Sequence, residues 1–144
     1  MLKLIPPLLG PELLATLRAM GHGDELVIAD ANFPAEFLGP QVHRADGISA
    51  TDMLDAVLTL MPLDDFVDEA AIAMQVVGDP TARPPIFATF EEIISRHEPK
   101  MGLSAIERFA FYDRAKKAAA VIQTGEARLY GNVILKKGII RPAS

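Results

Sequence analysis

His22 is the residue of this sequence best suited to moving a proton, because histidine is the side chain that changes charge most easily near neutral pH. It lies between two glycines in the segment Gly21-His22-Gly23-Asp24, so little side-chain bulk shields its ring from a ligand. Taken alone, the segment slightly favours a plainer role, in which a turn histidine hydrogen-bonds within its own loop.

Asp30 and Arg108 are the charged candidates for holding a polar ligand. Asp30 could bind a ligand hydroxyl, orient an imidazole or act as a base, or it could cap the loop that follows by accepting backbone hydrogen bonds. Arg108 could hold ligand oxygens with its guanidinium fork. Its alternative role is a surface ion pair with Glu107 or Asp113.

The segment Tyr130-Gly131-Asn132 brings a hydroxyl and a carboxamide into one short stretch. If the segment opens a strand, residues 130 and 132 share a face and could contact the same polar ligand. If it forms a tight turn, Gly131 supplies the unusual backbone angle and Asn132 tolerates it. The residues alone leave both possibilities open.

Other kinds of chemistry lack the residues they need. The chain has no cysteine, which excludes disulfides, thiolate catalysis and cysteine-ligated zinc. His22, His43 and His97 do not have the spacing of metal ligands. Gly21 and Gly23 lack the third glycine of a dinucleotide-binding turn, and no Gly-x-Ser-x-Gly nucleophile motif occurs. We therefore expect no metal and no cofactor.

The elements that must position these residues are predicted from apolar periodicity, prolines, glycines and capping residues. We expect helices over residues 11–20, 53–60 and 87–97 and a further helix within residues 107–120, and strands over residues 25–30, 71–77, 119–123 and 132–136. This alternation predicts an α/β fold, with a single three-layer α/β/α domain over residues 1–144 and a largely parallel central sheet. Ligands of such sheets bind beyond the carboxyl ends of the strands, where Asp30 is expected.

Composition narrows the class of protein further. The chain carries 14 basic and 19 acidic residues, so we expect no nucleic-acid partner, which would need a basic surface. Three prolines interrupt the apolar residues 1–14, so we expect a cytoplasmic protein with no signal peptide and no membrane-spanning helix. The mean hydropathy is +0.23. For a small domain, this value favours a homo-oligomer that covers part of the apolar surface.

Four segments in order along the chain carry a family resemblance. They are Met20-Gly-His-Gly-Asp-Glu25 with Ile28-Ala-Asp-Ala-Asn-Phe-Pro34, Gly39-Pro-Gln-Val-His-Arg-Ala-Asp-Gly47, Arg108-Phe-Ala-Phe-Tyr-Asp-Arg-Ala115, and Thr124-Gly-Glu126 with Tyr130-Gly-Asn-Val-Ile-Leu-Lys-Lys-Gly138. Together they resemble the L-fucose mutarotase family, which shares its fold with the D-ribose pyranases. The resemblance spans nearly the whole chain.

The resemblance implies a fold with helices on both faces of the sheet and a homo-oligomer as large as a decameric ring. It implies interconversion of the α and β anomers of L-fucose by general acid–base chemistry, without cofactor or metal. It also implies that His22 is the catalytic acid or base. The implied sugar-binding positions are Asp30, Arg108, Tyr130, Gly131 and Asn132.

Other functions remain possible at this stage. The ribose branch carries a histidine in place of Arg108 and lacks the run Phe109–Tyr112, which favours L-fucose over D-ribose or a related monosaccharide. The middle of the chain, residues 78–103, departs most from the family pattern. A non-catalytic sugar-binding accessory of an uptake system is a second alternative. A structural ring subunit with a decayed site is a third, and the presence of all five polar positions argues against it.

The two halves of the implied site lie far apart in the sequence. His22 and Asp30 belong to the first helix–strand unit, whereas Tyr130 and Asn132 belong to the last strand. We expect a neighbouring subunit to bring the two halves together. If His22 and Asp30 are close, the carboxylate would favour the protonated imidazole.

Overall fold

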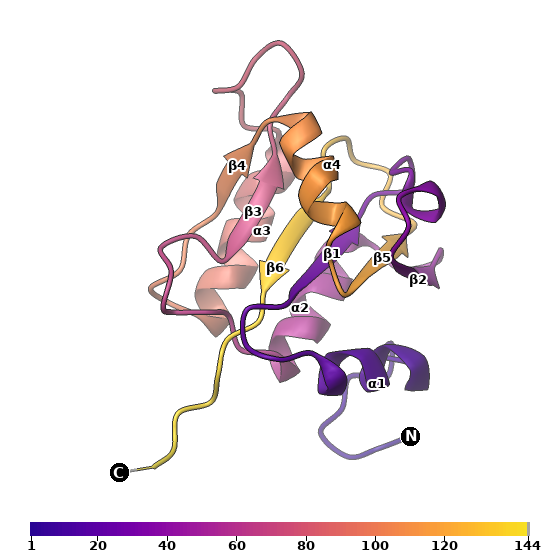
Figure 1. Ribbon diagram of the computed structural model, residues 1–144, viewed down its shortest axis with the longest axis vertical. Helices are drawn as coiled ribbons and strands as arrows, with labels where there is room; N and C mark the ends of the chain where they lie inside the picture. Colours follow the sequence, from indigo (N-terminus) through magenta and orange to yellow (C-terminus); the bar gives the residue numbers. More distant parts are fainter. Residues whose placement is uncertain (144) are drawn as a thin grey trace.

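A sheet of six strands in the order β2-β5-β1-β6-β3-β4 forms the centre of the computed structural model, which describes residues 1–143 (Figure 1). The strands are β1 (Glu25–Ala29), β2 (Gln41–Ala45), β3 (Ala71–Met74), β4 (Ser104–Ile106), β5 (Ala120–Thr124) and β6 (Val133–Lys136). The helices are α1 (Pro11–Ala19), α2 (Ala50–Leu60), α3 (Pro85–His97) and α4 (Arg108–Lys116), with a short 3₁₀ helix η1 (Ala35–Phe37).

Strand β6 is the exception in an otherwise parallel sheet. β1 pairs with β5, β5 with β2 and β3 with β4, all in parallel, whereas β6 lies antiparallel between β1 and β3. The prediction of an α/β fold with a largely parallel sheet is confirmed. Because β6 is reversed, the residues that precede it lie at the same edge as the residues that follow the other strands. We call this edge the carboxyl edge.

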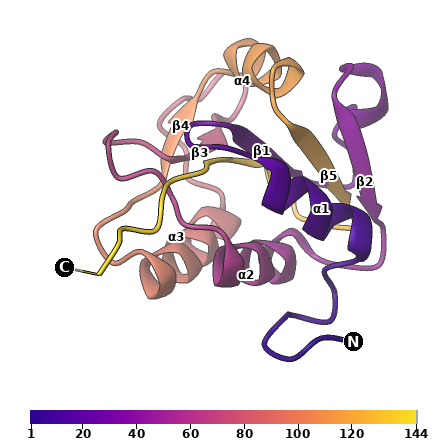
Figure 2. The same ribbon diagram turned by 60° about the horizontal axis from the view of Figure 1, so that its bottom comes forward.

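Helices cover both faces of the sheet, as the turned view in Figure 2 shows. The core on the face of α1, α2 and α3 includes Leu26 and Ile28, whereas Val27 and Ala29 belong to the core on the face of α4. Alternate side chains of a strand point to opposite faces, and a strand covered on both faces is apolar throughout. This explains the apolar run 26–29 and confirms the predicted three layers.

Two strands were not predicted, and both lie at edges of the sheet. β2 carries polar residues such as Gln41 and Arg44, which are exposed, and β4 has only three residues. Neither has the apolar run that identifies a buried strand. The predicted strand over 71–77 ends earlier, at Met74.

The start of α4 is fixed by its N-cap residue, Glu107. The carboxylate of Glu107 accepts hydrogen bonds from the backbone N–H groups of Phe109 (2.8 Å) and Ala110 (3.1 Å). These are two of the donors that the first turn of a helix leaves unpaired. The helix lies within the stretch 107–120, as predicted, and it ends where the chain turns at Lys117 before entering β5 at Ala120.

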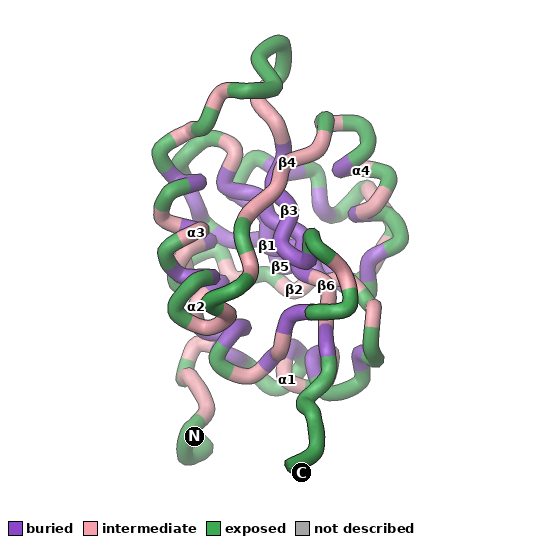
Figure 3. Tube along the Cα trace, turned by 90° about the vertical axis from the view of Figure 1, so that its left-hand side faces the viewer, coloured by how far each residue is buried: buried purple, intermediate pink, exposed green. Residues whose placement is uncertain are grey.

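Burial follows the layers. Figure 3 shows the inner strands β1, β3 and β5 buried at the centre, with exposed residues concentrated on the outer helix surfaces, the loops and both ends of the chain. None of the helices described over residues 1–143 is long and apolar enough to cross a membrane.

Candidate functional site

The carboxyl edge of the sheet gathers most of the residues that the sequence singled out. Asp30 directly follows β1, Arg108 begins α4 just after β4, and Tyr130-Gly131-Asn132 directly precedes β6. They meet at one cavity of about 250 Å³. The residues that line it are Asp30, Asn32, Phe33, Met74, Val77, Arg108, Tyr112, Leu129, Tyr130 and Asn132. The combination of charged, hydroxyl and apolar side chains suits a small, partly polar ligand.

Asp30 and Asn132 are joined by reciprocal hydrogen bonds, although 102 positions separate them in the sequence. The backbone N–H of Asp30 donates to Oδ1 of Asn132 (2.8 Å), and Nδ2 of Asn132 donates to Oδ2 of Asp30 (3.1 Å). The backbone N–H of Asn32 donates to Oδ1 of Asp30 (2.9 Å), so the predicted loop-capping role is confirmed. Each carboxylate oxygen still has lone-pair capacity for a ligand.

Two opposing effects act on the pKa of the Asp30 carboxyl. Burial raises its pKa above the ordinary value, because an apolar setting disfavours the charged form. The hydrogen bonds from Asn32 and Asn132 act against this effect by stabilising the carboxylate, and thus lower the pKa. The protein therefore balances the desolvation of a buried acid with donors that hold it in one orientation.

The backbone on both sides of Asp30 is tied to the end of β5. Nε2 of Gln123 donates to the carbonyl oxygen of Asp30 (2.5 Å), and Oγ1 of Thr124 donates to the carbonyl oxygen of Ala29 (2.6 Å). The backbone N–H of Ala31 donates to the carbonyl oxygen of Glu126 (2.9 Å). The segment 123–126 thus fixes the position from which the Asp30 carboxyl enters the cavity.

The Tyr130 segment is a turn and does not open the last strand, which begins at Val133. The left-handed backbone angle falls on Tyr130 itself (φ 62°), and not on Gly131. Gly131 is required for space, because a Cβ there would lie 2.8 Å from Cγ of Glu126 and 3.0 Å from Cδ1 of Ile86. The Tyr130 hydroxyl accepts a hydrogen bond from the backbone N–H of Val77 (3.1 Å).

Arg108 stands over the ring of Phe109, with its guanidinium carbon 4.6 Å from the ring centroid. Among the described residues it forms no ion pair with Glu107 or Asp113, so that alternative prediction is wrong. Its Nε is buried and has no hydrogen-bond partner within residues 1–143. A buried donor without a partner is costly, and a ligand oxygen in the cavity would satisfy it.

His22 lies at the other end of β1, away from this cavity. It precedes the strand, whereas Asp30 follows it. Nε2 of His22 is 2.9 Å from Oδ1 of Asp64, and its ring lies 5.0 Å from the ring of Phe66. The hydrogen bond with His22 lowers the pKa of Asp64. The side chain of Asp64 is buried, but that of His22 is 42% exposed. The imidazole is therefore hydrogen-bonded to a buried carboxylate while part of its ring stays accessible to a ligand.

Several site residues escaped the sequence analysis. Tyr112 was not among the predicted site residues but lines the cavity. Asp64 lies in a stretch to which no element had been assigned. Gln123 could have been identified from the sequence, because a polar residue within a buried apolar strand needs a hydrogen-bond partner.

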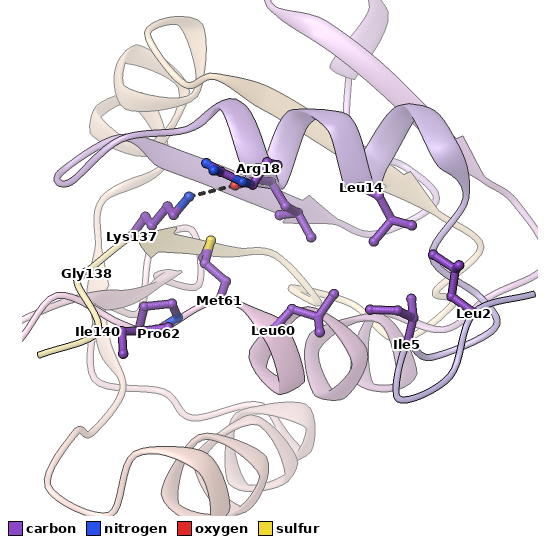
Figure 4. Close-up of a pocket in the computed structure, with 11 residues that line it drawn as sticks. Leu2, Ile5, Leu14, Arg18, Leu60, Met61, Pro62, Lys137, Gly138 and Ile140 are labelled. Atoms are coloured by element: carbon purple, nitrogen blue, oxygen red, sulfur yellow. Dashed lines mark hydrogen bonds between the residues drawn. The ribbon is translucent and has the colours of Figure 1, made fainter. Parts of the chain in front are cut away.

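A second, larger cavity of about 560 Å³ lies on the face of α1 and α2 (Figure 4). Apolar side chains line most of it, and Arg18 and Lys137 stand together at one end. Nζ of Lys137 donates to the carbonyl oxygens of Leu17 (2.7 Å) and Met20 (2.5 Å) at the end of α1, and burial lowers its pKa. None of the sequence-predicted site residues reaches this cavity. Among residues 1–143, no three side chains of the types that bind metals cluster closely enough to hold an ion.

Comparison with known proteins identifies the family of this chain. A profile of the RbsD / FucU transport protein family matches residues 3–140. The chain belongs to this family. Its fucose mutarotase relative from Homo sapiens is 49% identical over 145 residues, covering 96% of this chain and 94% of the relative.

Solved structures of RbsD/FucU family members have the same fold. The fucose mutarotase in complex with L-fucose from Streptococcus pneumoniae is 44% identical, with a TM-score of 0.90, and the match covers 97% of this chain and all of that one. FucU from Bifidobacterium longum is 45% identical, with a TM-score of 0.91, over 96% of this chain and all of that one. The family resemblance noted in the sequence is therefore confirmed.

Proposed function

We propose that this chain is a fucose mutarotase, a single-domain isomerase that interconverts the α and β anomers of L-fucose without a cofactor. The observation that carries this proposal is the 49% identity with the human fucose mutarotase over 96% of the chain. The cavity at the carboxyl edge supports it, because a carboxylate, a guanidinium, two carboxamides and two phenol hydroxyls line a space suited to a small ligand.

The chemistry requires two proton transfers. A pyranose changes anomer by opening to the aldehyde, rotating about one bond and reclosing. Opening takes a proton from the anomeric hydroxyl and delivers one to the ring oxygen, and closing reverses both steps. No bond between sugar and protein is needed. General acid–base catalysis, worth roughly 10²–10⁴-fold for a well-placed group, is sufficient for such a reaction.

Asp30, Arg108, Tyr130 and Asn132 bind the sugar in this proposal. The Asp30 carboxylate accepts hydrogen bonds from sugar hydroxyls with the lone pairs that Asn32 and Asn132 leave free. The unpaired Nε of Arg108 donates to a sugar oxygen. Gly131 contributes by letting the turn pack against Glu126.

His22 carries out both transfers in turn, taking the proton of the anomeric hydroxyl and delivering it to the ring oxygen, and ring closure reverses the two steps. Because its hydrogen bond lowers the pKa of Asp64, Asp64 is ionised near neutral pH and accepts a hydrogen bond from the Nε2–H of His22. Nδ1 is then the ring atom that gives or takes a proton. Asp64 holds the imidazole in this tautomer and orientation, as carboxylates do for catalytic histidines.

His22 must reach the sugar from a neighbouring subunit. The five residues of β1 separate it from Asp30, and at about 3.3 Å per residue this amounts to roughly 16 Å. The expectation of a shared site therefore takes a new form. Asp30 was expected on a different subunit from Tyr130 and Asn132, but the three residues lie together in one chain. The two parts of the shared site are therefore His22 on one subunit and these three residues on its neighbour.

The first test is saturation-transfer NMR between the two anomeric proton signals of a free sugar, with and without protein. We expect transfer for L-fucose to rise strongly with added protein, and to rise less for D-ribose, D-galactose and L-rhamnose. Faster exchange of D-ribose than of L-fucose would make the chain a ribose pyranase instead.

A non-catalytic sugar-binding role is the second candidate, and the description of the family as transport proteins favours it. In that case the protein would broaden the L-fucose signals through binding but leave the exchange rate between anomers unchanged. The proposed enzyme works in the cytoplasm as a homo-oligomer, in keeping with the sequence-based predictions. Light scattering tests the assembly, and a monomer would remove the shared site.

A further inference from the structure

Apolar side chains line part of the otherwise polar cavity. Two of them, Phe33 and Met74, are buried. The other two, Val77 and Leu129, are 54% and 67% exposed. The first pair is part of the packed core, whereas the second pair lines the cavity without being buried.

Tyr130 is linked to the backbone at both exposed residues. Its hydroxyl accepts the hydrogen bond of the Val77 backbone N–H at 3.1 Å, and a second bond, from the N–H of Asp79 to the carbonyl oxygen of Val76 (3.1 Å), closes the turn around Val77. Leu129 directly precedes Tyr130, whose left-handed φ of 62° sets the direction of the chain there. The residue proposed to bind the sugar is thus also linked to the apolar side of the cavity.

L-fucose has polar and apolar substituents that match the polar and apolar sides of the cavity. Its pyranose ring carries hydroxyls on C1 to C4 and a single apolar substituent, the methyl group on C5. The charged and amide groups of Asp30, Arg108 and Asn132 can satisfy hydroxyls, but a hydroxyl held against Met74, Val77 and Leu129 side chains would find no hydrogen-bond partner among them.

We propose that Met74, Val77 and Leu129 form a subsite for the C5 methyl group, and that this subsite makes the protein selective for 6-deoxy sugars. The inference rests on the proposed mutarotase function and specifies the substrate class of that site. Apolar pockets discriminate a missing methyl group or an added hydroxyl by about 10- to 100-fold in kcat/KM. That range is the preference we expect.

Three sugars with the same configuration at C2 to C4 isolate this position. L-fucose carries a methyl group on C5, L-galactose carries a hydroxymethyl group and D-arabinose carries only hydrogen. Exchange between their anomers is measured by saturation-transfer NMR, with the uncatalysed rate of each sugar subtracted. We expect the protein to accelerate L-fucose exchange about tenfold or more over that of the other two.

Val77→Ser and Leu129→Ser test the side chains themselves. Both positions are more than half exposed, so the fold should survive. Each variant should lower L-fucose exchange about tenfold while changing D-arabinose exchange little, so that the preference shrinks. Phe37→Ser is the matched control, because Phe37 is equally apolar, 93% exposed and outside the cavity.

The outcomes separate the subsite from the function on which it rests. Equal acceleration of all three sugars by the wild-type protein would overturn the subsite and leave the mutarotase standing. Serine variants that slow the exchange of all three sugars alike would also overturn the subsite. The same holds if the variants change the molar mass in light scattering and leave the preference for L-fucose intact, since Val77 and Leu129 would then be subunit contacts. Acceleration of none of the sugars would overturn the proposed function and the subsite with it.

Discussion

Replacing Asn132 with alanine should damage both the stability of the fold and the acid–base behaviour of the site. The Asn132 side chain is 4% exposed and makes two hydrogen bonds to Asp30. The neutral bond to the Asp30 N–H is worth about 1 kcal/mol, and the bond to the carboxylate about 1.5–3 kcal/mol. Asn132→Ala should therefore lower the free energy of unfolding by about 3 kcal/mol, or Tm by about 10 °C for a chain of this length.

The same substitution should move the pH profile. The amide of Asn132 lowers the pKa of Asp30 against the larger effect of burial, so its loss should raise that pKa further. If exchange needs the ionised carboxylate, activity is lost as pH falls through the pKa of Asp30. The acid limb of kcat/KM should therefore lie above the ordinary aspartate range near pH 4, and should shift to still higher pH in Asn132→Ala.

Circular dichroism melts at one protein concentration measure the stability, because the chain has no tryptophan for fluorescence. Asn32→Ala is the matched control, since Asn32 binds Asp30 only through its backbone N–H, which alanine keeps. If Asn132→Ala melts within 2 °C of Asn32→Ala, or if its acid limb stays in place, the Asp30–Asn132 pair does not have the role described.

Three further substitutions test other parts of the structure. Gly131→Ala should cost about 1–3 kcal/mol by overpacking against Glu126 and Ile86; a denaturation midpoint equal to that of the wild type would contradict the close approach. Arg108→Lys keeps the charge but loses the fork, so L-fucose exchange should fall while Tm stays within a few degrees; unchanged exchange would remove Arg108 from the site. Lys137→Met removes two hydrogen bonds from the end of α1 and should lower Tm without slowing exchange, and a loss of exchange at unchanged Tm would tie the second cavity to catalysis.

The sequence predicted the parts of the fold that depend on local patterns. The apolar run of β1 and the proline and glycine that flank α1 predicted both elements within a residue or two of their observed bounds. The reversed direction of β6 could not be predicted, because direction in a sheet depends on which strands pair, and a short apolar strand is the same in either direction. That reversal is what brings residues 130–132 beside Asp30.

The candidate site was predicted in its residue types but not in its arrangement. Asp30 could be placed because a strand visibly ends before it. Its pairing with Asn132 is a contact between distant segments, and no local pattern encodes it. The left-handed angle of Tyr130 was assigned to Gly131, because glycine is the usual residue for such an angle. In fact the tight packing against Glu126 requires a glycine at 131, and the angle falls on the residue before it.

The position of His22 is the most consequential of these differences. A histidine and an aspartate eight residues apart could lie close together if the segment between them formed a loop. Here a whole strand separates them, and the imidazole faces outward with Asp64 behind it. This separation makes assembly a condition of catalysis in the mechanism proposed above.

The most direct test of this mechanism is L-fucose anomer exchange in a mixture of His22→Ala and Tyr130→Ala subunits, measured by saturation-transfer NMR after verified subunit exchange. Each variant alone should be slower than the wild type by about 10²-fold or more. In a random equal mixture, about one interface in four pairs an intact His22 with an intact Tyr130 across a head-to-tail contact. We predict recovery of about that fraction of wild-type exchange. A mixture that exchanges subunits and stays as inactive as its parts would contradict a site shared between neighbours.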